Sequence, residues 1–372
     1  MKQNPFVISG YSGSEYFCNR ELETERLISA VKNQRNITLF SLRRMGKTGL
    51  IWHVFHSLKN EKAISPIYVD IMPTLNISDF TVSFAKAILT ALAKKPGLLK
   101  RILTTLTSLR PTLSYDPISG SPEISVKVDR QTDIEHSLES IFHLLASENQ
   151  QFVIALDEFQ QITLYPEKEI EALLRSHIQK LNNVTFVFSG SRKHILTEIF
   201  SIPNRPFFNS TEKMEINTID PEVYKAFIET HFKKNNIKIQ TNAMDEIEKC
   251  TGLHTFYVQF LSNRLYGSGL KRIEKQDVEN MYKQIIAENE PIYANYLNIL
   301  TPLQFRLLKA LAKDEGYGGI TSKDYLMRHN LGAASSVNTA SKSLFDKDFI
   351  YADKNRYYLT DKFFKGWLAG LD

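Results

Sequence analysis

The chain has 372 residues, 42% of them hydrophobic and 23% charged, with a formal net charge of +5 at pH 7. This length predicts two or three globular domains, and the composition argues against a disordered chain. No apolar run approaches the length of a membrane-spanning helix, and residues 1–6 start no signal peptide. The two cysteines have neither metal-site nor disulfide spacing, so we expect a cytoplasmic protein without membrane contact. The mild charge permits contact with nucleic acid without requiring it.

The first predicted strand, Ile37–Phe40, leads into Ser41–Thr48, which reads SLRRMGKT, and then into an amphipathic helix. This order and the GxxxxGK[ST]-like spacing predict a phosphate-binding loop, where main-chain N–H groups and a helix N-terminus bind phosphate oxygens. Lys47 would reach the β- and γ-phosphates, and the Thr48 hydroxyl would bind Mg²⁺. The residues assigned to nucleotide binding here are Arg44, Met45, Gly46, Lys47, Thr48 and Gly49.

One position departs from the pattern, because Ser41 stands where its first Gly is expected. Glycine is favoured there because the chain turns sharply out of the strand, and some of the dihedrals are costly for a residue with a Cβ. Serine is small enough to be tolerated. The helix that follows carries core-spaced apolar residues, namely Leu50, Ile51, Val54, Phe55 and Leu58.

A second strand is predicted at Pro66–Ile71. Between about Pro96 and Arg130 the pattern of helices and strands breaks, and prolines flank short alternating runs such as Ile124–Val128. These runs predict a β-hairpin inserted between helices. No chemistry is assigned to it.

The next strand, Phe152–Leu156, is apolar throughout and is followed by the paired acids Asp157 and Glu158. A buried parallel strand with carboxylates at its C-terminal edge is typical of a nucleotide site. Asp157 would hold the Mg²⁺ shell, and Glu158 would polarise the attacking water. The alternative is a buried strand followed by a solvated turn. The combination of this strand and its two acids with SLRRMGKT favours a nucleoside triphosphatase.

A further strand, Val184–Phe188, ends in Ser189, Gly190, Ser191 and Arg192. Ser189 and Ser191 are candidates to contact the γ-phosphate or the attacking water, and Arg192 could reach the γ-phosphate as a bidentate cation. The alternative is a turn with a surface arginine.

Arg205 precedes the last predicted strand, Lys213–Asn217, and could act on a neighbouring subunit. A positioning or surface role is the alternative for this residue as well. Strands that alternate with helices predict an α/β fold with a parallel five-stranded sheet covered on both faces. We therefore expect a core over residues 1–218.

The chain then turns helical, with helices predicted at Pro221–Lys234, Thr241–Cys250, His254–Tyr266 and Lys275–Glu288. This block, residues 219–290, is expected to form a lid over the nucleotide. A break is predicted at Glu288–Pro291, and a third module would occupy residues 291–372.

The third module is predicted to be a winged helix-turn-helix. Its helices are expected at Thr301–Asp314, Ser322–His329 and Ala333–Phe345, and its wing strands at Phe349–Ala352 and Arg356–Leu359. In the third helix, core-spaced and polar residues fall on opposite faces; the core set is Val337, Ala340 and Leu344, and the polar set is Ser335, Asn338, Thr339 and Lys342.

The polar face of that helix could enter a DNA major groove, with Lys354 and Arg356 of the wing near phosphates. Residues 301–372 carry only 11 Lys and Arg against 8 Asp and Glu, which is a thin basic surface for DNA. A protein-contact role for the winged helix is therefore kept open.

Several segments together resemble the AAA+-related P-loop ATPases of the STAND group, and most closely the archaeal-type ATPase family. They are YFCNRE (Tyr16–Glu21), SLRRMGKT, VIALDEFQ (Val153–Gln160), FSGSR (Phe188–Arg192) and YYLTDKFFKGW (Tyr357–Trp367). The resemblance implies a five-stranded core, a helical lid, a winged helix, and ATP with Mg²⁺ as ligands. It also implies that Asn19 and Arg20 help to seat the base.

The lid departs from the family pattern. Where the family has a Gly-x-Pro or Gly-His-Pro turn, this chain has Thr251–Phe256 (TGLHTF), with Leu253 at the nearer Gly position and Thr255 at the Pro position. A structural role is expected for His254.

The sequence thus favours a slow Mg²⁺-dependent ATPase that acts as a nucleotide-controlled switch, with self-association on ATP binding as one outcome. ATP is preferred to GTP on the family resemblance, since no guanine-reading motif is visible. Two alternatives stay open: a DNA-binding regulator whose nucleotide only sets its conformation, and a nucleotide-bound scaffold without turnover.

Overall fold

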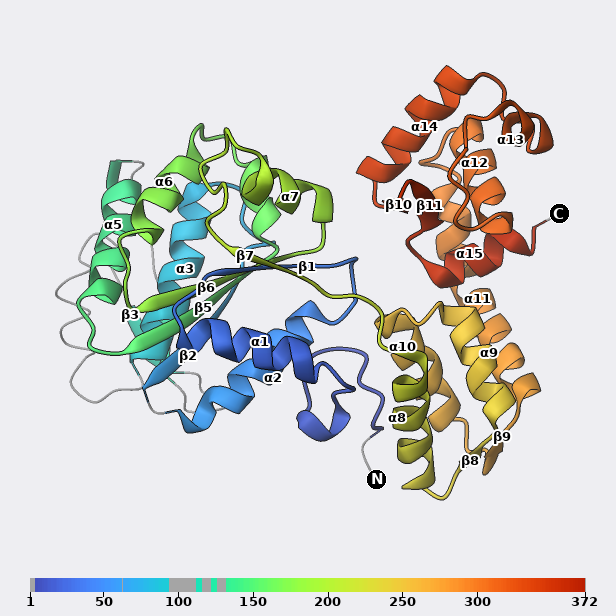
Figure 1. Ribbon diagram of the computed structural model, residues 1–372, viewed down its shortest axis with the longest axis horizontal. Coiled ribbons are helices and arrows are strands. Elements are labelled where there is room, and N and C mark those ends of the chain that lie inside the picture. Colours follow the sequence, from blue (N-terminus) through green and yellow to red (C-terminus); the bar gives the residue numbers. More distant parts are fainter. Residues whose placement is uncertain (1–3, 62, 94–111, 116–121, 126–131, 372) are drawn as a thin grey trace. The chain divides into compact units, whose positions relative to one another are not determined.

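The computed structural model describes every residue except 1–3, 62, 94–111, 116–121, 126–131 and 372 (Figure 1). The chain divides into two compact units. One is Gly10–Asn217, and the other is Met1–Ser9 together with Thr218–Asp372. Crossing a bilayer takes about 20 apolar residues in one helix, and no described helix meets that requirement.

The first unit contains the predicted sheet. Its five strands lie in the order β2-β5-β6-β1-β7 and all are parallel, which confirms the expected α/β fold. The strands are β1 (Ile37–Phe40), β2 (Ile64–Asp70), β5 (Gln151–Asp157), β6 (Val184–Gly190) and β7 (Glu212–Glu215). The helices are α1 (Glu21–Lys32), α2 (Lys47–Ser57), α3 (Ile77–Leu92), α5 (Thr132–Ala146), α6 (Ile170–Ile178) and α7 (Lys193–Ser201). Single turns of 3₁₀ helix lie at η1 (Ser14–Tyr16) and η2 (Leu58–Asn60), and a longer one is η4 (Phe159–Leu164).

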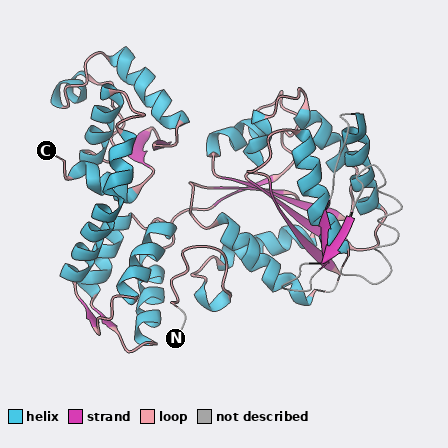
Figure 2. Cartoon of the chain, turned by 180° about the vertical axis from the view of Figure 1, so that it is seen from behind, coloured by secondary structure: helices cyan, strands magenta, loops and turns pink. Residues whose placement is uncertain are grey.

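Helices cover both faces of the sheet (Figures 1 and 2). On one face, α1 and α2 pack on the alternate strand residues Leu39, Val153 and Val187. On the other face, α3, α5, α6 and α7 pack on residues such as Ile154 and Phe186. The apolar residues predicted for the helix after the phosphate loop, Leu50 to Leu58, are buried as expected. Because the strands are parallel, their carboxyl ends share one edge, where ligands bind in such sheets.

The inserted hairpin is confirmed for its described part. β3 (Thr112–Tyr115) and β4 (Pro122–Ser125) pair in antiparallel fashion. The remainder of the predicted run, residues 126–128, lies outside the described residues.

The second unit is helical apart from two small two-stranded sheets. Its predicted helices are confirmed as α8 (Pro221–Lys233), α9 (Thr241–Thr251) and α10 (Thr255–Tyr266). Strand β8 (Lys238–Ile239) lies between α8 and α9, and β9 (Arg272–Ile273) follows α10. Phe6 near the N-terminus is fully buried beside Phe232 and Tyr266, so this segment packs with the helical block.

The break predicted at Glu288–Pro291 is wrong, because helix α11 (Lys275–Tyr296) runs through Pro291. An interior proline removes one helical hydrogen bond and costs about 3 kcal/mol. Packing beyond it offsets this cost: Tyr293 is buried against Phe364 and Trp367, with ring centroids 5.1 and 5.8 Å apart. Tertiary contacts therefore override the local signal.

The winged helix-turn-helix is confirmed. It consists of α12 (Pro302–Lys313), α13 (Lys323–Arg328), α14 (Ala334–Asp346), β10 (Ile350–Asp353) and β11 (Arg356–Leu359), followed by an unpredicted helix, α15 (Lys362–Ala369). The core residues predicted in α14 are buried, and the four polar residues of its opposite face are exposed.

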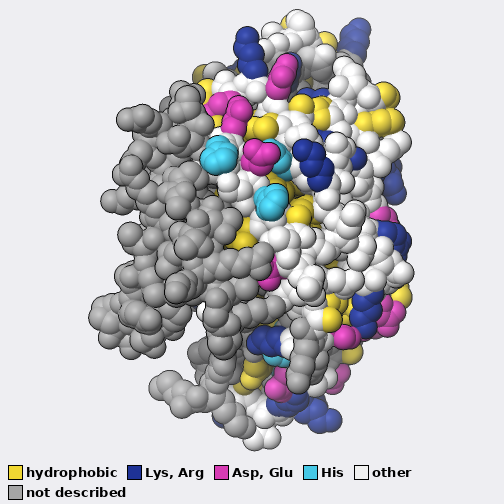
Figure 3. Space-filling view, turned by 90° about the vertical axis from the view of Figure 1, so that its left-hand side faces the viewer, with side chains coloured by type: hydrophobic (Ala, Val, Ile, Leu, Met, Phe, Trp, Pro, Cys, Tyr) yellow, Lys and Arg dark blue, Asp and Glu magenta, His cyan; other side chains and the backbone are white. Residues whose placement is uncertain are grey.

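One face of the molecule shows histidine, acidic and basic side chains close together (Figure 3). His177 of α6 stacks on Phe142 of α5, and burial and then Lys180 lower its pKa, while Glu139 opposes them. Among the described residues no group of three or more His, Cys, Asp or Glu side chains is placed to hold a metal ion.

Candidate nucleotide-binding site

The loop after β1 makes its sharp turns at Arg44 and Gly46, which have φ of 62° and 94°. Ser41 is not among the described residues with positive φ. Because the left-handed conformation that favours glycine occurs later in the loop, a serine fits at the first position without backbone strain. Met45 is buried, and Gly46 forms the N-cap of α2.

Lys47 begins α2 and is only 5% exposed. Its Nζ donates to Ser41 Oγ at 3.0 Å and to the Leu42 carbonyl at 3.2 Å. Burial lowers the pKa of Lys47 to about 8, although Glu158 and Asp157 oppose that shift. Its hydrogen-bond partners are neutral, so the ammonium keeps its charge available to an anionic ligand.

Asp157, at the end of β5, joins the loop to the sheet. Its Oδ2 accepts hydrogen bonds from Thr48 Oγ1 and from the Tyr68 hydroxyl, both at 2.7 Å. Its Oδ1 accepts from the Glu158 main-chain N–H at 3.0 Å. The two residues predicted to bind Mg²⁺ are thus direct neighbours, although they lie far apart in the sequence.

Glu158 lies beside the end of β6. Its Oε2 accepts from Ser191 Oγ at 2.8 Å and from Gln160 Nε2. Glu158 itself has φ of 57°, a left-handed conformation that is uncommon without glycine. A Cβ at Gly190 would clash with Gln160 Oε1, so a glycine is needed there for Gln160 to reach Glu158. The carboxylate is therefore held in place by two donors.

Arg205, by contrast, has its partner outside this group. Arg205 pairs with Glu171 of α6 through two hydrogen bonds, one of them 3.0 Å long. Arg192 is partly exposed at the N-cap of α7. Ser189 is fully buried within β6. Their functional roles remain predictions.

Arg20 and Asn19, assigned by resemblance to the base, lie at the start of α1. Arg20 is buried, and its guanidinium donates to Glu23 Oε1 at 2.8 Å and to the Asn217 carbonyl at 2.6 Å. Asn19 Oδ1 accepts from the Arg20 N–H at 2.7 Å. Gly49 lies in the first turn of α2, and a Cβ at this position would be 3.4 Å from the Phe17 ring. This segment therefore contacts the first turn of α2.

The divergent turn between α9 and α10 belongs to the second unit. Gly252 and Leu253 have φ of 57° and 56°, and His254 forms the N-cap of α10 with 5% exposure. Leucine thus adopts a left-handed conformation where the family pattern has glycine. His254 is thus a buried residue at the start of α10, and its structural role stays a prediction.

The oxygen atoms at the sheet edge are suitable ligands for a divalent cation. Mg²⁺ prefers oxygen ligands and is usually held by one or two protein oxygens with water and phosphate. The Thr48 hydroxyl and the Asp157 carboxylate, already in contact, provide such oxygens. These two residues would hold Mg²⁺.

The family described as "ATPase domain predominantly from Archaea" matches residues 17–256. The chain belongs to this family. A second match, described as a probable winged helix domain, covers residues 291–370. The archaeal-type ATPase resemblance and the AAA+-type P-loop fold with a winged helix are thereby confirmed. None of the curated proteins compared with the chain matches it.

Solved structures share the fold at low sequence identity. The Walker-type ATPase PABY2304 of Pyrococcus abyssi aligns with a TM-score of 0.63 and 17% identity, covering 98% of this chain and 99% of that one. The ORC2 protein of Aeropyrum pernix, in ADPNP–ADP complexes, gives 0.58 and 15% identity over 98% and 95%. The ORC1 protein of Aeropyrum pernix, in complex with DNA, gives 0.52 and 15% identity over 95% and 92%.

Sequence reasoning missed three site residues: Tyr68, Asp70 and Gln160. Asp70 ends β2 and pairs in register with Asp157. Partial burial raises its pKa, as do Asp157 and Glu158, while a hydrogen bond from the Met72 N–H opposes them. The signal for Asp70 was present, since an acid after an apolar strand had already identified Asp157. Tyr68 and Gln160 have no such signal in the sequence, because their contacts depend on tertiary structure.

Proposed function

We propose that this protein is a Mg²⁺-dependent ATPase that acts as a slow nucleotide-controlled switch of the STAND type. The observation that supports this most strongly is the convergence of Lys47, Thr48, Asp157 and Glu158 at one edge of the sheet. They combine a phosphate-binding cation, oxygen ligands for a metal and a carboxylate base, as phosphoryl transfer to water requires.

Each residue has a separate task. Lys47 exchanges its bonds to Ser41 and Leu42 for bonds to the β- and γ-phosphates. Glu158 orients the attacking water and accepts its proton, while Ser191 and Gln160 hold the carboxylate. Mg²⁺, when bound, neutralises charge on the phosphates. Ser191 or Arg192 contacts the γ-phosphate, so that the conformation of the chain depends on whether this phosphate is present.

Phosphate release from purified variants tests the site. Lys47→Ala is expected to abolish ATP binding. Glu158→Gln should bind ATP normally and turn over at least about a hundredfold more slowly, because the base is lost. Glu169→Gln, at an exposed glutamate that also has positive φ, is the matched control and should behave as the wild type. Unchanged release from the first two variants would refute the assignment.

The switch itself needs a different measurement. Residues 219–290 are assigned to the lid and 291–372 to the output module, and their rearrangement with the nucleotide state would be the signal. Light scattering with ADP and then with a non-hydrolysable ATP analogue reports self-association. A mass that grows with the analogue, and that Arg205→Ala abolishes, supports action of Arg205 across subunits. A constant mass and an unchanged proteolysis pattern would contradict the switch.

A DNA-binding regulator is the second candidate. The polar face of α14 and the wing residues Lys354 and Arg356 are exposed, and a structurally similar ORC1 protein is in complex with DNA. Binding of duplex DNA by the full chain should then weaken with salt and with Asn338→Ala and Lys342→Ala. Absence of binding at low salt would eliminate this candidate.

A further inference from the structure

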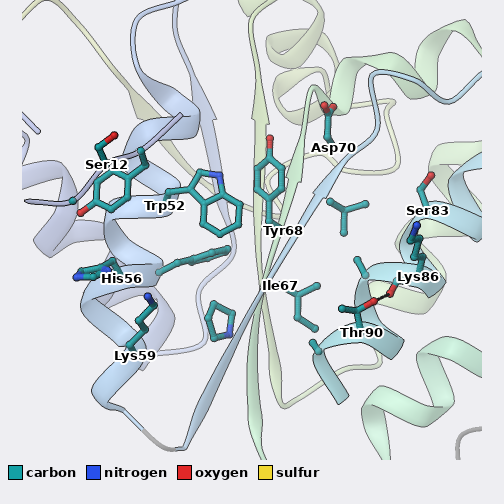
Figure 4. Close-up of a pocket in the computed structure, with 17 residues that line it drawn as sticks. Ser12, Trp52, His56, Lys59, Ile67, Tyr68, Asp70, Ser83, Lys86 and Thr90 are labelled. Atoms are coloured by element: carbon teal, nitrogen blue, oxygen red, sulfur yellow. Dashed lines mark hydrogen bonds between the residues drawn. The ribbon is translucent and has the colours of Figure 1, made fainter. Parts of the chain in front are cut away.

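A groove runs along the outer edge of the sheet in the first unit, with a volume of about 890 Å³. Strand β2 forms its floor, and helices α2 and α3 form its two walls (Figure 4). Trp52 and Lys59 line one side, and Ser83 and Lys86 the other. The groove therefore lies between the two helices, alongside the last strand of the sheet.

The main chain of β2 is paired on one side. Of the described strands, only β5 is its neighbour. The Ala63 carbonyl accepts from the Gln151 N–H, and the Ile71 N–H donates to the Asp157 carbonyl. Main-chain groups of alternate residues in a strand point to opposite sides. The N–H groups of Tyr68 and Asp70, and the carbonyls of Pro66 and Tyr68, therefore point into the groove.

Pro66 limits how a strand could pair here. Proline has no N–H, and within sheets it is confined to edge positions whose N–H would face outward. Its place in β2 matches that rule. It removes one donor from the N-terminal half of the edge, so pairing is concentrated on Tyr68 and Asp70 in the C-terminal half.

The side chains of the groove define the chemistry of its occupant. Trp52, 40% exposed, lies beside Tyr68 with ring centroids 5.1 Å apart, which gives an apolar shelf. Lys59 is exposed on the α2 side of the groove, toward the start of β2, and Lys86 is exposed on the α3 wall beside Ser83, whereas Asp70 lies at the end where β2 finishes (Figure 4). Each side of the groove thus carries one lysine.

We propose that this groove binds an extended, acidic segment of a partner protein, which adds to β2 as a sixth strand. Main-chain hydrogen bonds to Tyr68 and Asp70 would supply affinity, and acidic side chains opposite Lys59 and Lys86 would supply specificity. Residues 94–111 of this chain carry five Lys and Arg and no Asp or Glu, so they have the wrong charge for the groove.

The groove is connected to the nucleotide site. The Tyr68 ring lines the groove, and its hydroxyl donates to the Asp157 oxygen that also accepts from Thr48. A segment that contacts Tyr68 therefore acts one hydrogen bond away from the metal-binding carboxylate. This coupling, unlike the docking itself, rests on the proposed ATPase function.

The test is a displayed library of random nine-residue peptides selected on the full chain. The enriched sequences are expected to combine acidic with β-branched residues. Their affinity should fall at least about tenfold for the double variant K59E/K86E, since like charges repel across an interface. The control K168E/K180E reverses two exposed lysines that do not line the groove, and should leave affinity unchanged.

Hydrogen exchange locates the bound peptide. The amides of Tyr68 and Asp70 should become protected when the selected peptide is added. No enrichment, enrichment of basic sequences, or protection confined to other segments would overturn the proposal. So would a single-stranded oligonucleotide that competes for the same lysines, because the groove would then bind nucleic acid.

The coupling is tested separately. Tyr68→Phe should still bind the peptide, but the peptide should no longer alter ATP turnover. Peptide binding is measured without nucleotide, so failure of the ATPase assignment leaves that result intact. A peptide that changes turnover equally in the wild type and in Tyr68→Phe would disprove the route through Asp157.

Discussion

Among the residues that the structure describes, each unit buries one lysine, and the two lysines have different partners. Lys47 in the first unit is 5% exposed, and its partners are a hydroxyl and carbonyls. Lys362 in the second unit is 7% exposed, and its Nζ lies 2.7 Å from Glu315 Oε1. Burial lowers the pKa of both lysines.

The difference lies in the charge balance. Lys362 and Lys365 lower the pKa of Glu315 against the effect of its burial, so this group is a closed ion pair that stabilises the winged helix. Lys47 lacks such direct neutralisation, and its nearest carboxylates hold other partners. A buried charge without a direct counterion is costly, and such groups cluster at functional sites.

The largest expected effects come from replacing each lysine by methionine. Lys47→Met should weaken ATP binding by at least about a hundredfold, because the phosphate contact is lost. It should not destabilise the protein without nucleotide. Lys362→Met should leave ATP binding unchanged and lower the free energy of unfolding by about 1–3 kcal/mol, because Glu315 loses a buried partner. Calorimetric titration and denaturant unfolding of both variants measure this. If both variants lose ATP affinity, or both lose stability, the two lysines do not differ in role.

Two glycines extend the same comparison. A Cβ at Gly190 would clash with Gln160, whereas one at Gly366 would clash with the Tyr282 hydroxyl and lie 2.7 Å from Ile286 Cδ1. Gly190→Ala should reduce kcat about tenfold, because the clash disturbs both donors to Glu158, Gln160 directly and Ser191 as the next residue in the chain. Gly366→Ala should destabilise the second unit by about 1–2 kcal/mol without changing kcat. Gly370→Ala, whose nearest atoms lie 3.5 Å away, is the control. A loss of kcat in Gly366→Ala would contradict the separation of roles.

Two adjacent glutamines provide a finer test within the first unit. Gln160 donates to Glu158, while Gln161 donates to the Thr74 carbonyl at 2.9 Å. Gln160→Ala should lower kcat about three- to fivefold, with unchanged ATP affinity, because Glu158 loses one of two orienting donors. Gln161→Ala should leave kcat as in the wild type. Equal effects from both substitutions would show that the loss is structural.

The smallest expected effect is the uptake of a fraction of a proton when ATP binds. The pKa of Lys47 is about 8 in the free protein, so at pH 9 its amine is mostly neutral. Phosphates favour the ammonium and raise this pKa, and ATP binding at pH 9 should take up about 0.9 proton. At pH 6.5 Lys47 is already protonated and should contribute no uptake. Titration calorimetry in buffers of different ionisation enthalpy measures both. Equal uptake at the two pH values would exclude Lys47 as the source.

The pH dependence of stability has a definite sign. The pKa of Lys47 in the folded protein is lower than its ordinary value of 10.5, so the unfolded chain binds more protons between about pH 8 and 10.5. The contribution of Lys47 to the free energy of unfolding therefore rises with pH across that window.

The sequence predicted what depends on local pattern. The five sheet strands were recognisable as apolar runs, and the phosphate loop and Asp157–Glu158 as motifs tied to strand ends. Residues whose roles depend on contacts between distant segments were missed. Tyr68 reaches Asp157 only because β2 and β5 pair in a particular register, and Gln160 reaches Glu158 only because of the turn at η4. Pro291 led to the opposite error, a predicted helix break that is absent, because the packing of Tyr293 outweighs the helix-breaking tendency of the proline.

That proline lies within a helix whose length has a mechanical consequence. At 22 residues, α11 is about 33 Å long, and it continues without a break from the helical block, where it packs on α9, to the winged helix, where it packs on α15. A tilt of about 10° at one end therefore moves the other by about 6 Å. Residues 219–290 and 291–372 share this one continuous helix, so we expect them to move together rather than about a hinge at Pro291.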